Sequence, residues 1–278
     1  MDPRAFAAET AAATVVVQLR GANKTYPNGL RALEPIDLSV REGEFTTLLG
    51  PSGCGKSTLL RMIAMLTPPT GGTISLWPQK EAAGAASEGA RRLAFVFQTP
   101  TLMPWASVER NVSLPLVLSH NDPPQVSARV ARALKLVGLE EFRALYPRQL
   151  SGGMQKRVSI ARALVTEPAL LLMDEPFAAL DEITRAHLDQ EIRELWARRS
   201  LTVLFVTHSI YEAVFLSTRV LVMSTRPGRI VGEFDIDEPH PRNDAFRMSE
   251  RFAAHCQRLS GLLLKGSRAD PLRPQAAQ

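Results

Sequence analysis

Cysteine is scarce in this chain, which carries only Cys54 and Cys256 among its 278 residues. Two cysteines make no disulfide framework, and neither belongs to the Cys-x-x-Cys spacing of structural zinc sites. Long apolar runs are missing as well, since the most apolar stretches, residues 169–173 and 201–206, are far shorter than the ~20 residues that span a bilayer. The sequence therefore predicts a protein of a reducing compartment that does not cross a membrane by itself.

The composition is otherwise average for a globular protein, with 45% hydrophobic and 22% charged residues, which excludes disorder for most of the chain. At this length, one large α/β domain, or one domain with a small appendage, can bury a core without disulfides or structural metal, and two packed domains remain an alternative. The formal net charge of +5 mildly favours anionic partners such as phosphates, nucleic acid or an acidic membrane surface. Residues 1–13 are rich in Ala and Thr, and Glu9 interrupts their apolar run, so we expect a flexible tail rather than a signal peptide.

The pattern of apolar residues indicates the order of the elements. Alternation from residue 15 to residue 19 favours a β-rich start. We then expect strands at 45–49, 93–97, 170–173 and 202–206, and helices at 56–66, 126–137, 151–165 and 182–199. This alternation is typical of a parallel sheet with crossover helices. A turn at 226–229 joins the two strands of a final hairpin.

Two helices show an apolar stripe. In helix 182–199, we expect the Arg and Glu side chains to be solvated and the following residues to face the core: Ile183, His187 or Leu188, Ile192, Leu195 and Trp196. Beyond Pro241, a further helix presents one apolar face made of Phe246, Ala253, Cys256, Leu259 and Leu263. Periodicity alone leaves open whether that face packs on this chain or on a partner.

A glycine-rich loop lies between strand 45–49 and the helix that follows. It fits the pattern G-x-x-x-x-G-K-[ST] and consists of Gly50, Pro51, Ser52, Gly53, Cys54, Gly55, Lys56 and Ser57, with Thr58 next in the helix. In this pattern the backbone N–H groups close round a phosphate, the Lys reaches the β- and γ-phosphates, and the hydroxyl binds Mg²⁺. The loop therefore predicts a nucleotide-binding site. Because the backbone does the binding, Cys54 need not be a redox switch, and the sequence leaves open whether it has a redox role.

Two carboxylates, Asp174 and Glu175, come directly after the apolar strand 170–173. A nucleotide site needs one carboxylate for the metal and one to handle the attacking water, and the carboxyl ends of strands are where such groups belong. By itself, an Asp-Glu pair after a strand is more often the start of a helix. Together with the phosphate loop, it predicts that Asp174 holds Mg²⁺ and that Glu175 is the base, with strands 45–49 and 170–173 side by side.

The sequence Leu150-Ser151-Gly152-Gly153-Met154-Gln155 resembles the signature motif of the ATP-binding cassette (ABC) transporter ATPases. Its Ser and glycine amides lie at the start of a helix, where backbone N–H groups and the helix dipole favour an anion. A plain helix N-cap is the alternative interpretation. The fifth residue is Met154 instead of the commoner Gln, but Gln155 follows, an arrangement similar to that of several importer ATPases.

The resemblance covers residues 15–235 and implies roles for four further residues. Tyr26 matches the aromatic residue that stacks on adenine, and Gln98 matches the glutamine that touches Mg²⁺ and the attacking water. Asp181 matches the aspartate of the D-loop, and His208 matches the switch histidine that contacts the γ-phosphate. Each also has a plainer interpretation: a structural Tyr, an exposed loop Gln, a helix N-cap and a structural His.

The same resemblance implies the fold and the domains. We expect an α/β protein with a P-loop NTPase core, built from a parallel sheet, an antiparallel β subdomain and a helical subdomain. Its parts are the tail at 1–13, an ATP-binding domain at 14–236 with the helical subdomain at about 99–166, and a C-terminal helical extension and tail at 237–278. The family implies ATP and Mg²⁺ as cofactors and a head-to-tail dimer in which each phosphate loop faces residues 151–153 of the second copy.

One cassette without a membrane span is typical of an importer subunit that docks on a separate permease. Residues 99–105, 207–213 and 226–229 resemble the ATPases that import nitrate, sulfonates, taurine or bicarbonate. This predicts a peripheral ATPase on the cytoplasmic side of the inner membrane that works with permease subunits and, indirectly, an extracytoplasmic solute-binding protein. Leu102, Met103 and Trp105 are either the coupling surface or ordinary packing of the helical subdomain. The sequence does not identify the transported solute.

Two other classes of protein share the phosphate loop. A non-transport ABC ATPase acting on nucleic acid receives slight support from the net charge of +5. The chain has neither the long coiled coils of the DNA-repair members nor the second cassette of the translation-factor members, so we expect no nucleic-acid partner. A P-loop kinase has no use for the motif at residues 151–153.

Overall fold

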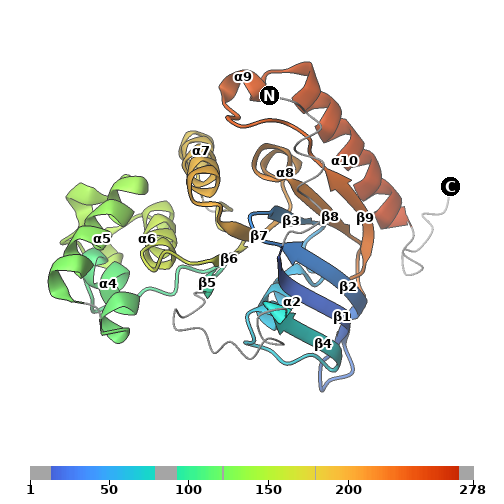
Figure 1. The fold of residues 1–278 in the computed structure, drawn as a ribbon, viewed down its shortest axis with the longest axis horizontal. Coiled ribbons are helices and arrows are strands. Elements are labelled where there is room, and N and C mark those ends of the chain that lie inside the picture. The colour runs from blue at the N-terminus through green and yellow to red at the C-terminus, as the bar shows by residue number, and fades with distance from the viewer. Residues whose placement is uncertain (1–13, 79–92, 121, 179, 269–278) are drawn as a thin grey trace.

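A six-stranded sheet forms the centre of the structure, a computed structural model that describes residues 14–78, 93–120, 122–178 and 180–268 (Figure 1). The tails expected at both ends of the chain lie outside these ranges. The strand order is β5-β6-β7-β3-β8-β9, and only the pair β8 and β9 is antiparallel. The strands are β3 (Phe45–Leu49), β5 (Leu93–Val96), β6 (Leu170–Asp174), β7 (Thr202–Thr207), β8 (Arg219–Met223) and β9 (Ile230–Asp235).

This sheet separates two hydrophobic cores, because successive side chains of a strand point to opposite faces. In β3, Phe45 and Leu49 belong to one core and Leu48 to the other. All five residues of β3 and all five of β6 are buried, as expected for strands covered on both faces. The ends of these strands, and so the starting points of the loops that follow them, are therefore fixed by the packing of the sheet.

A second, three-stranded antiparallel sheet covers one face of the first. Its order is β2-β1-β4, formed by β1 (Val15–Thr25), β2 (Arg31–Arg41) and β4 (Gly71–Leu76). Between the two sheets lies α2 (Lys56–Ile63), whose apolar side chains fill the shared core. The helix ends three residues before the expected Leu66, and Met65 adopts a left-handed φ of 57°.

The third part of the fold is helical and stands apart at the left of Figure 1. It consists of α4 (Val108–Leu118), α5 (Pro123–Leu136) and α6 (Gly152–Leu164), with short 3₁₀ turns η2 (Glu140–Phe142) and η3 (Pro147–Gln149) between α5 and α6. Asn111, completely buried, ties the segment before α4 together by donating to the carbonyl oxygens of Met103 and Ala106. The predicted fold class, with parallel sheet, antiparallel β subdomain and helical subdomain, is confirmed.

The prediction for α7 (Glu182–Arg199) was right for its middle and wrong for its start. Leu188 and Ile192 are buried as expected, but Ile183 is 84% exposed. Arg193, expected on the solvated face, is only 2% exposed. Its Nη1 donates a 2.6 Å hydrogen bond to the carbonyl oxygen of Leu216 at the end of α8 (Ile210–Leu216), where the last carbonyl groups of a helix have no donor within the helix.

The C-terminal extension packs on this chain, which answers the question that the sequence left open. It forms a short helix, α9 (Asp244–Arg247), and then α10 (Glu250–Arg268), which lies along α8, β8 and β9 (Figure 1). Phe252 and Leu259 are buried hydrophobic residues of α10, whereas Ala253, expected on the apolar face, is exposed. Neither α10 nor any other helix in the described ranges is both long and apolar enough to cross a membrane.

Candidate active site

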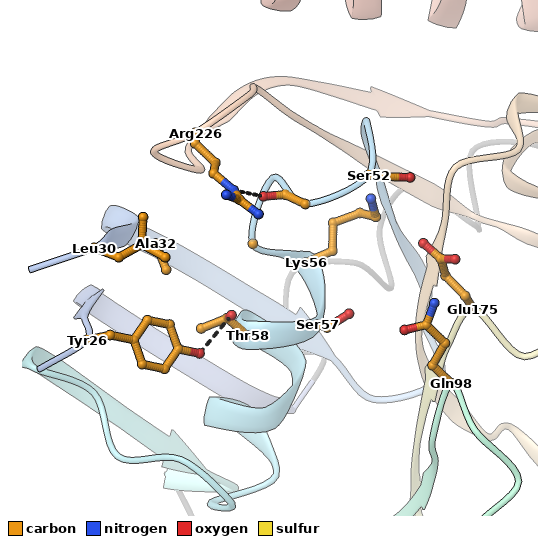
Figure 2. Close-up of a pocket in the computed structure, with 12 residues that line it drawn as sticks. Tyr26, Leu30, Ala32, Ser52, Lys56, Ser57, Thr58, Gln98, Glu175 and Arg226 are labelled. Carbon is orange, nitrogen blue, oxygen red and sulfur yellow. Dashed lines mark hydrogen bonds between the residues drawn. The ribbon is translucent and has the colours of Figure 1, made fainter. Parts of the chain in front are cut away.

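A cavity of about 320 Å³ lies where the phosphate loop meets the carboxyl ends of the central strands (Figure 2). The structure brings together in its lining half of the predicted site residues: Tyr26, Ser52, Gly53, Gly55, Lys56, Ser57, Thr58, Gln98 and Glu175. Gly50, Pro51 and Cys54 belong to the same loop without lining the cavity. Leu30, Ala32 and Arg226 also line it, and the sequence analysis did not predict them as site residues.

The phosphate loop leads directly from β3 into α2. Gly55 precedes the helix with φ of 103°, and a Cβ there would lie 2.6 Å from the side chain of Leu33, so only glycine fits. Lys56 Nζ donates 2.8 Å hydrogen bonds to the carbonyl oxygens of Gly50 and Pro51, which folds its side chain over the loop. Cys54 is buried, and burial raises the pKa of its thiol, so the loop contains no reactive thiolate.

Ser57 and Asp174 are in direct contact, although β3, which leads to Ser57, and β6, which ends at Asp174, are not neighbours. Ser57 Oγ donates a 2.7 Å hydrogen bond to Asp174 Oδ1. The expectation that β3 and β6 lie side by side was wrong, because β7 lies between them. The contact forms nevertheless because Ser57 stands in the first turn of α2, beyond the end of β3.

Asp174 is a completely buried carboxylate with an unused acceptor. Its Oδ2 has no hydrogen-bond partner in the described part of the chain, and burial raises the pKa of the carboxyl group. Buried oxygen atoms without a partner are costly, which points to a further group at this position. Carboxylate, hydroxyl and amide oxygens from Asp174, Ser57 and Gln98 are the ligand types that Mg²⁺ prefers, usually together with substrate phosphates.

Glu175 and His208 meet at the ends of adjacent strands. Glu175 N donates a 3.0 Å hydrogen bond to the carbonyl oxygen of Val206 in β7, and His208 directly follows that strand. The distance from His208 Nδ1 to Glu175 Oε2 is 3.5 Å. Glu175 itself lines the cavity, on the side where Gln98 also reaches in (Figure 2). A carboxylate and an imidazole are therefore held together beside the loop.

Lys156 fixes the backbone next to Gln98, a contact that the sequence analysis missed. The side chain comes from α6, is 1% exposed, and its Nζ donates to the carbonyl oxygens of Phe97 and Gln98 at 2.5 and 2.8 Å. Burial lowers the pKa of Lys156 to about 8, against the opposing pull of Asp174 and Glu175. No sequence signal marked it, because a lysine in a helix is usually solvated.

The opposite end of the cavity is apolar. Tyr26, Leu30 and Ala32 line it, and the Tyr26 hydroxyl lies 3.2 Å from Thr58 Oγ1. This bond fixes the ring at the edge of the cavity (Figure 2). A flat apolar group is suited to this end, and a polyanion is suited to the end with the phosphate loop.

The signature motif and Asp181 do not line this cavity. Ser151 is the N-cap of α6 and accepts a hydrogen bond from Met154 N at 3.2 Å. Asp181 is the N-cap of α7 and accepts from Thr184 N at 2.9 Å, a bond that lowers the pKa of its carboxyl group. Within one copy, both residues therefore have the capping role that the sequence analysis kept as an alternative.

Comparison with known proteins agrees with this geometry. The ABC transporter family matches residues 33–178. The chain is 46% identical over 212 residues to the taurine import ATP-binding protein TauB of Rhizobium johnstonii, covering 76% of this chain and 79% of that protein. It is 41% identical over 227 residues to the aliphatic sulfonates import ATP-binding protein SsuB of Bacillus subtilis, covering 82% and 85%.

A solved structure shares the fold as well. The dimeric ATP-binding cassette MJ0796, in a post-hydrolysis state bound to ADP and Pi, superimposes with a TM-score of 0.71 at 33% identity, covering 80% of this chain and all of that one. The predicted family and the predicted ATPase activity are confirmed. By its sequence, its fold and the cavity at its phosphate loop, the chain belongs to the ABC transporter family, as an ATP-binding subunit that hydrolyses ATP.

Proposed function

We propose that this chain is the ATPase of an importer that takes up a small solute of the nitrate, sulfonate or taurine type through a separate membrane permease. The observation that carries the hydrolytic part is the contact between Ser57 and Asp174 at 2.7 Å, with Lys56 and Glu175 lining the same cavity. The importer part is supported by the names of relatives at 46% and 41% identity.

In this proposal, Lys56 and the loop amides offset the charge of the β- and γ-phosphates. Ser57, Asp174 and Gln98 hold Mg²⁺, for which the unpartnered Oδ2 of Asp174 is a fitting ligand. Once bound, Mg²⁺ neutralises charge on the phosphates of ATP. The apolar end of the cavity receives adenine, which stacks on Tyr26.

Glu175 polarises the attacking water, and His208 contacts the γ-phosphate. Both sit at the carboxyl ends of buried strands, with Glu175 Oε2 3.5 Å from His208 Nδ1. A positioned general base typically contributes about 10²–10⁴-fold to a rate. Gln98 orients the same water, and Lys156 holds the backbone of Gln98 from α6.

Two copies of the chain complete each site. In a head-to-tail dimer, Ser151, Gly152 and Gly153 of one copy face the phosphates held by the other, and Asp181 lies at the same interface. The start of α6 is suited to this role, because Ser151 and Gly152 are exposed and a Cβ on Gly152 would meet nothing within 4 Å. Support also comes from MJ0796, whose solved structure is a dimer.

The permease docks at Trp105, on the cytoplasmic side of the membrane. Of the three residues considered for coupling, Leu102 packs against the core, and Met103 N is bonded to Asn111 Oδ1 at 2.8 Å. Trp105 is 75% exposed and offers its ring to a partner. A solute-binding protein acts through the permease and does not touch this chain.

The variant Glu175→Gln tests the proposal, because an amide cannot take a proton from water. ATP binding is expected to persist while turnover falls about 10²–10⁴-fold, and the ATP-bound dimer accumulates. Glu191→Gln, a half-buried position on α7 outside the cavity, is the matched control. Normal turnover in Glu175→Gln would refute the assignment of the base.

A pull-down tests the importer part. Glu175→Gln protein with Mg-ATP is used to capture partners from detergent-solubilised membranes, and mass spectrometry identifies them. A multi-span permease supports the proposal, and its companion solute-binding protein points to the solute. Recovery of only nucleic-acid-associated or other soluble proteins would contradict it. Trp105→Ala should lose the permease, whereas Leu118→Ala, also exposed but on α4, should keep it.

A further inference from the structure

The turn after β8 forms a wall of the nucleotide cavity. Gly228 N donates to the carbonyl oxygen of Ala32, and Glu34 N donates to that of Gly228, both at 2.9 Å, so the turn is fixed to β2. A Cβ on Gly228 would lie 2.0 Å from the carbonyl oxygen of Cys54. The turn therefore touches the phosphate loop directly and holds its own side chains in a defined place above it.

Arg226 is the side chain that this turn brings into the cavity. Its Nε donates a 2.6 Å hydrogen bond to the carbonyl oxygen of Gly53, and Figure 2 shows the guanidinium reaching down to the loop. Within the described part of the chain, no other hydrogen bond or ion pair engages this side chain. The N–H groups on Nη1 and Nη2 therefore remain available to a ligand, and Arg is suited to phosphate because these donors form a planar fork.

The charge of the cavity points the same way. Among the described residues that line it, only Lys56, Glu175 and Arg226 are charged. Without Arg226 the positive and negative charges cancel, although the proposed ligand is a polyphosphate. With Arg226 the lining is net positive, which favours such a ligand.

We propose that Arg226 is a nucleotide-binding residue that contacts the phosphate chain near the sugar. The inference rests on the proposed function and adds a contact to it. In Figure 2, Arg226 stands between the Tyr26 end of the cavity and the end with Lys56 and Glu175. Its anchor, Gly53, belongs to the phosphate loop. The guanidinium therefore lies where the phosphate chain would lead from this loop towards the apolar end of the cavity.

The test compares Arg226→Gln with Arg229→Gln. Arg229 is an exposed arginine of the same turn that does not line the cavity, so its variant removes an equal charge from nearly the same place. Calorimetric titration of each protein with ATP and with GTP, in EDTA to prevent hydrolysis, gives the dissociation constants. We expect binding to weaken about tenfold in Arg226→Gln, to stay unchanged in Arg229→Gln and to be intermediate in Arg226→Lys.

Three further results separate a phosphate contact from other roles. If Arg226 contacts a phosphate, Arg226→Gln binds ATP and GTP more weakly by the same factor, and its binding is less sensitive to salt than that of wild type. A loss confined to ATP would overturn the inference, since it would show a contact with the base. So would a lower melting temperature of Arg226→Gln without nucleotide together with a recovery of affinity at low temperature, since the bond to Gly53 would then be merely structural.

The inference and the proposed function fail in distinguishable ways. If wild-type protein binds ATP and Arg226→Gln binds it equally well, the inference alone is overturned. If wild-type protein does not bind ATP, the proposed function falls and the inference falls with it.

Discussion

Replacing Gly228 by alanine tests how closely the turn after β8 packs on the phosphate loop. The added Cβ would lie 2.0 Å from the carbonyl oxygen of Cys54 and 3.0 Å from Leu33 Cδ2. Real Cβ atoms essentially never approach another heavy atom within 3.0 Å, so the backbone has to move by about an ångström. Either the turn leaves its hydrogen bonds to β2, or the phosphate loop is displaced.

The expected losses follow from that displacement. Forcing an extra carbon into a packed site typically costs about 1–3 kcal/mol of the free energy of unfolding. A shift of about 1 Å in a binding loop typically lowers catalysis about 10²-fold, because the reacting groups are no longer aligned. Gly228→Ala should therefore lose about 10²-fold in ATPase kcat/KM while remaining folded.

Gly261→Ala is the matched control for this substitution. Gly261 lies in α10, where a Cβ would meet nothing within 4 Å. Since alanine favours a helix over glycine by about 0.5–1 kcal/mol, this variant should gain stability and keep its ATPase activity. Steady-state ATPase assays and urea unfolding of both variants decide the matter. Activity of Gly228→Ala within twofold of wild type would refute the predicted contact with the loop.

Two further predictions concern buried charges around the C-terminal extension. Arg242 donates to the carbonyl oxygens of Val214, Phe215, Ser217, Ile236 and Glu238, so Arg242→Ala should lower the free energy of unfolding by about 3–5 kcal/mol in urea titrations, with Arg242→Lys between. A loss below about 1 kcal/mol would mean that these carbonyls find other donors. Burial raises the pKa of Asp189 to about 7, so between about pH 4 and 7 the folded state holds a proton that the unfolded chain releases. The free energy of unfolding of wild type, relative to that of Asp189→Asn, should therefore fall as pH rises through this window, by up to about 1.4 kcal/mol per pH unit. The same difference between the two proteins at pH 5 and at pH 7 would contradict this.

Local patterns in the sequence were enough to predict the elements and the loops that bind nucleotide. The expected strand 45–49 and helix 182–199 coincide with β3 and α7, because period-2 and period-3.6 patterns and N-cap residues act within a few positions of the chain. The phosphate loop could be predicted for the same reason, since its motif spans only eight consecutive residues, 50–57. The roles of its residues toward ATP and Mg²⁺ remain predictions that the variants above test.

Contacts between segments that are distant in the sequence could not be predicted from it. Arg193 is buried because the carbonyl oxygen of Leu216, 23 positions away, accepts its hydrogen bond. The residues near Arg193 in the sequence do not indicate that such an acceptor is present. Arg226 meets Gly53 across 173 positions, so the motif 226–229 was recognised as a turn and not as part of the site. Ile183 has helical spacing with the core residues of α7, yet it lies in the first turn of the helix, where no element in the described ranges covers it.

The order of the strands explains why the candidate catalytic groups meet. Because β7 lies between β3 and β6, the loop that follows β7 emerges next to both the phosphate loop and the end of β6. Glu175 N is bonded to Val206 in β7, and His208 comes two residues later, which sets their side chains 3.5 Å apart. If β6 lay directly beside β3, as the motifs led us to expect, β7 would be displaced to the far side of one of them. His208 would then start one strand further from either Glu175 or the phosphate loop, so the observed order shortens the reach that its proposed contacts with Glu175 and the γ-phosphate need.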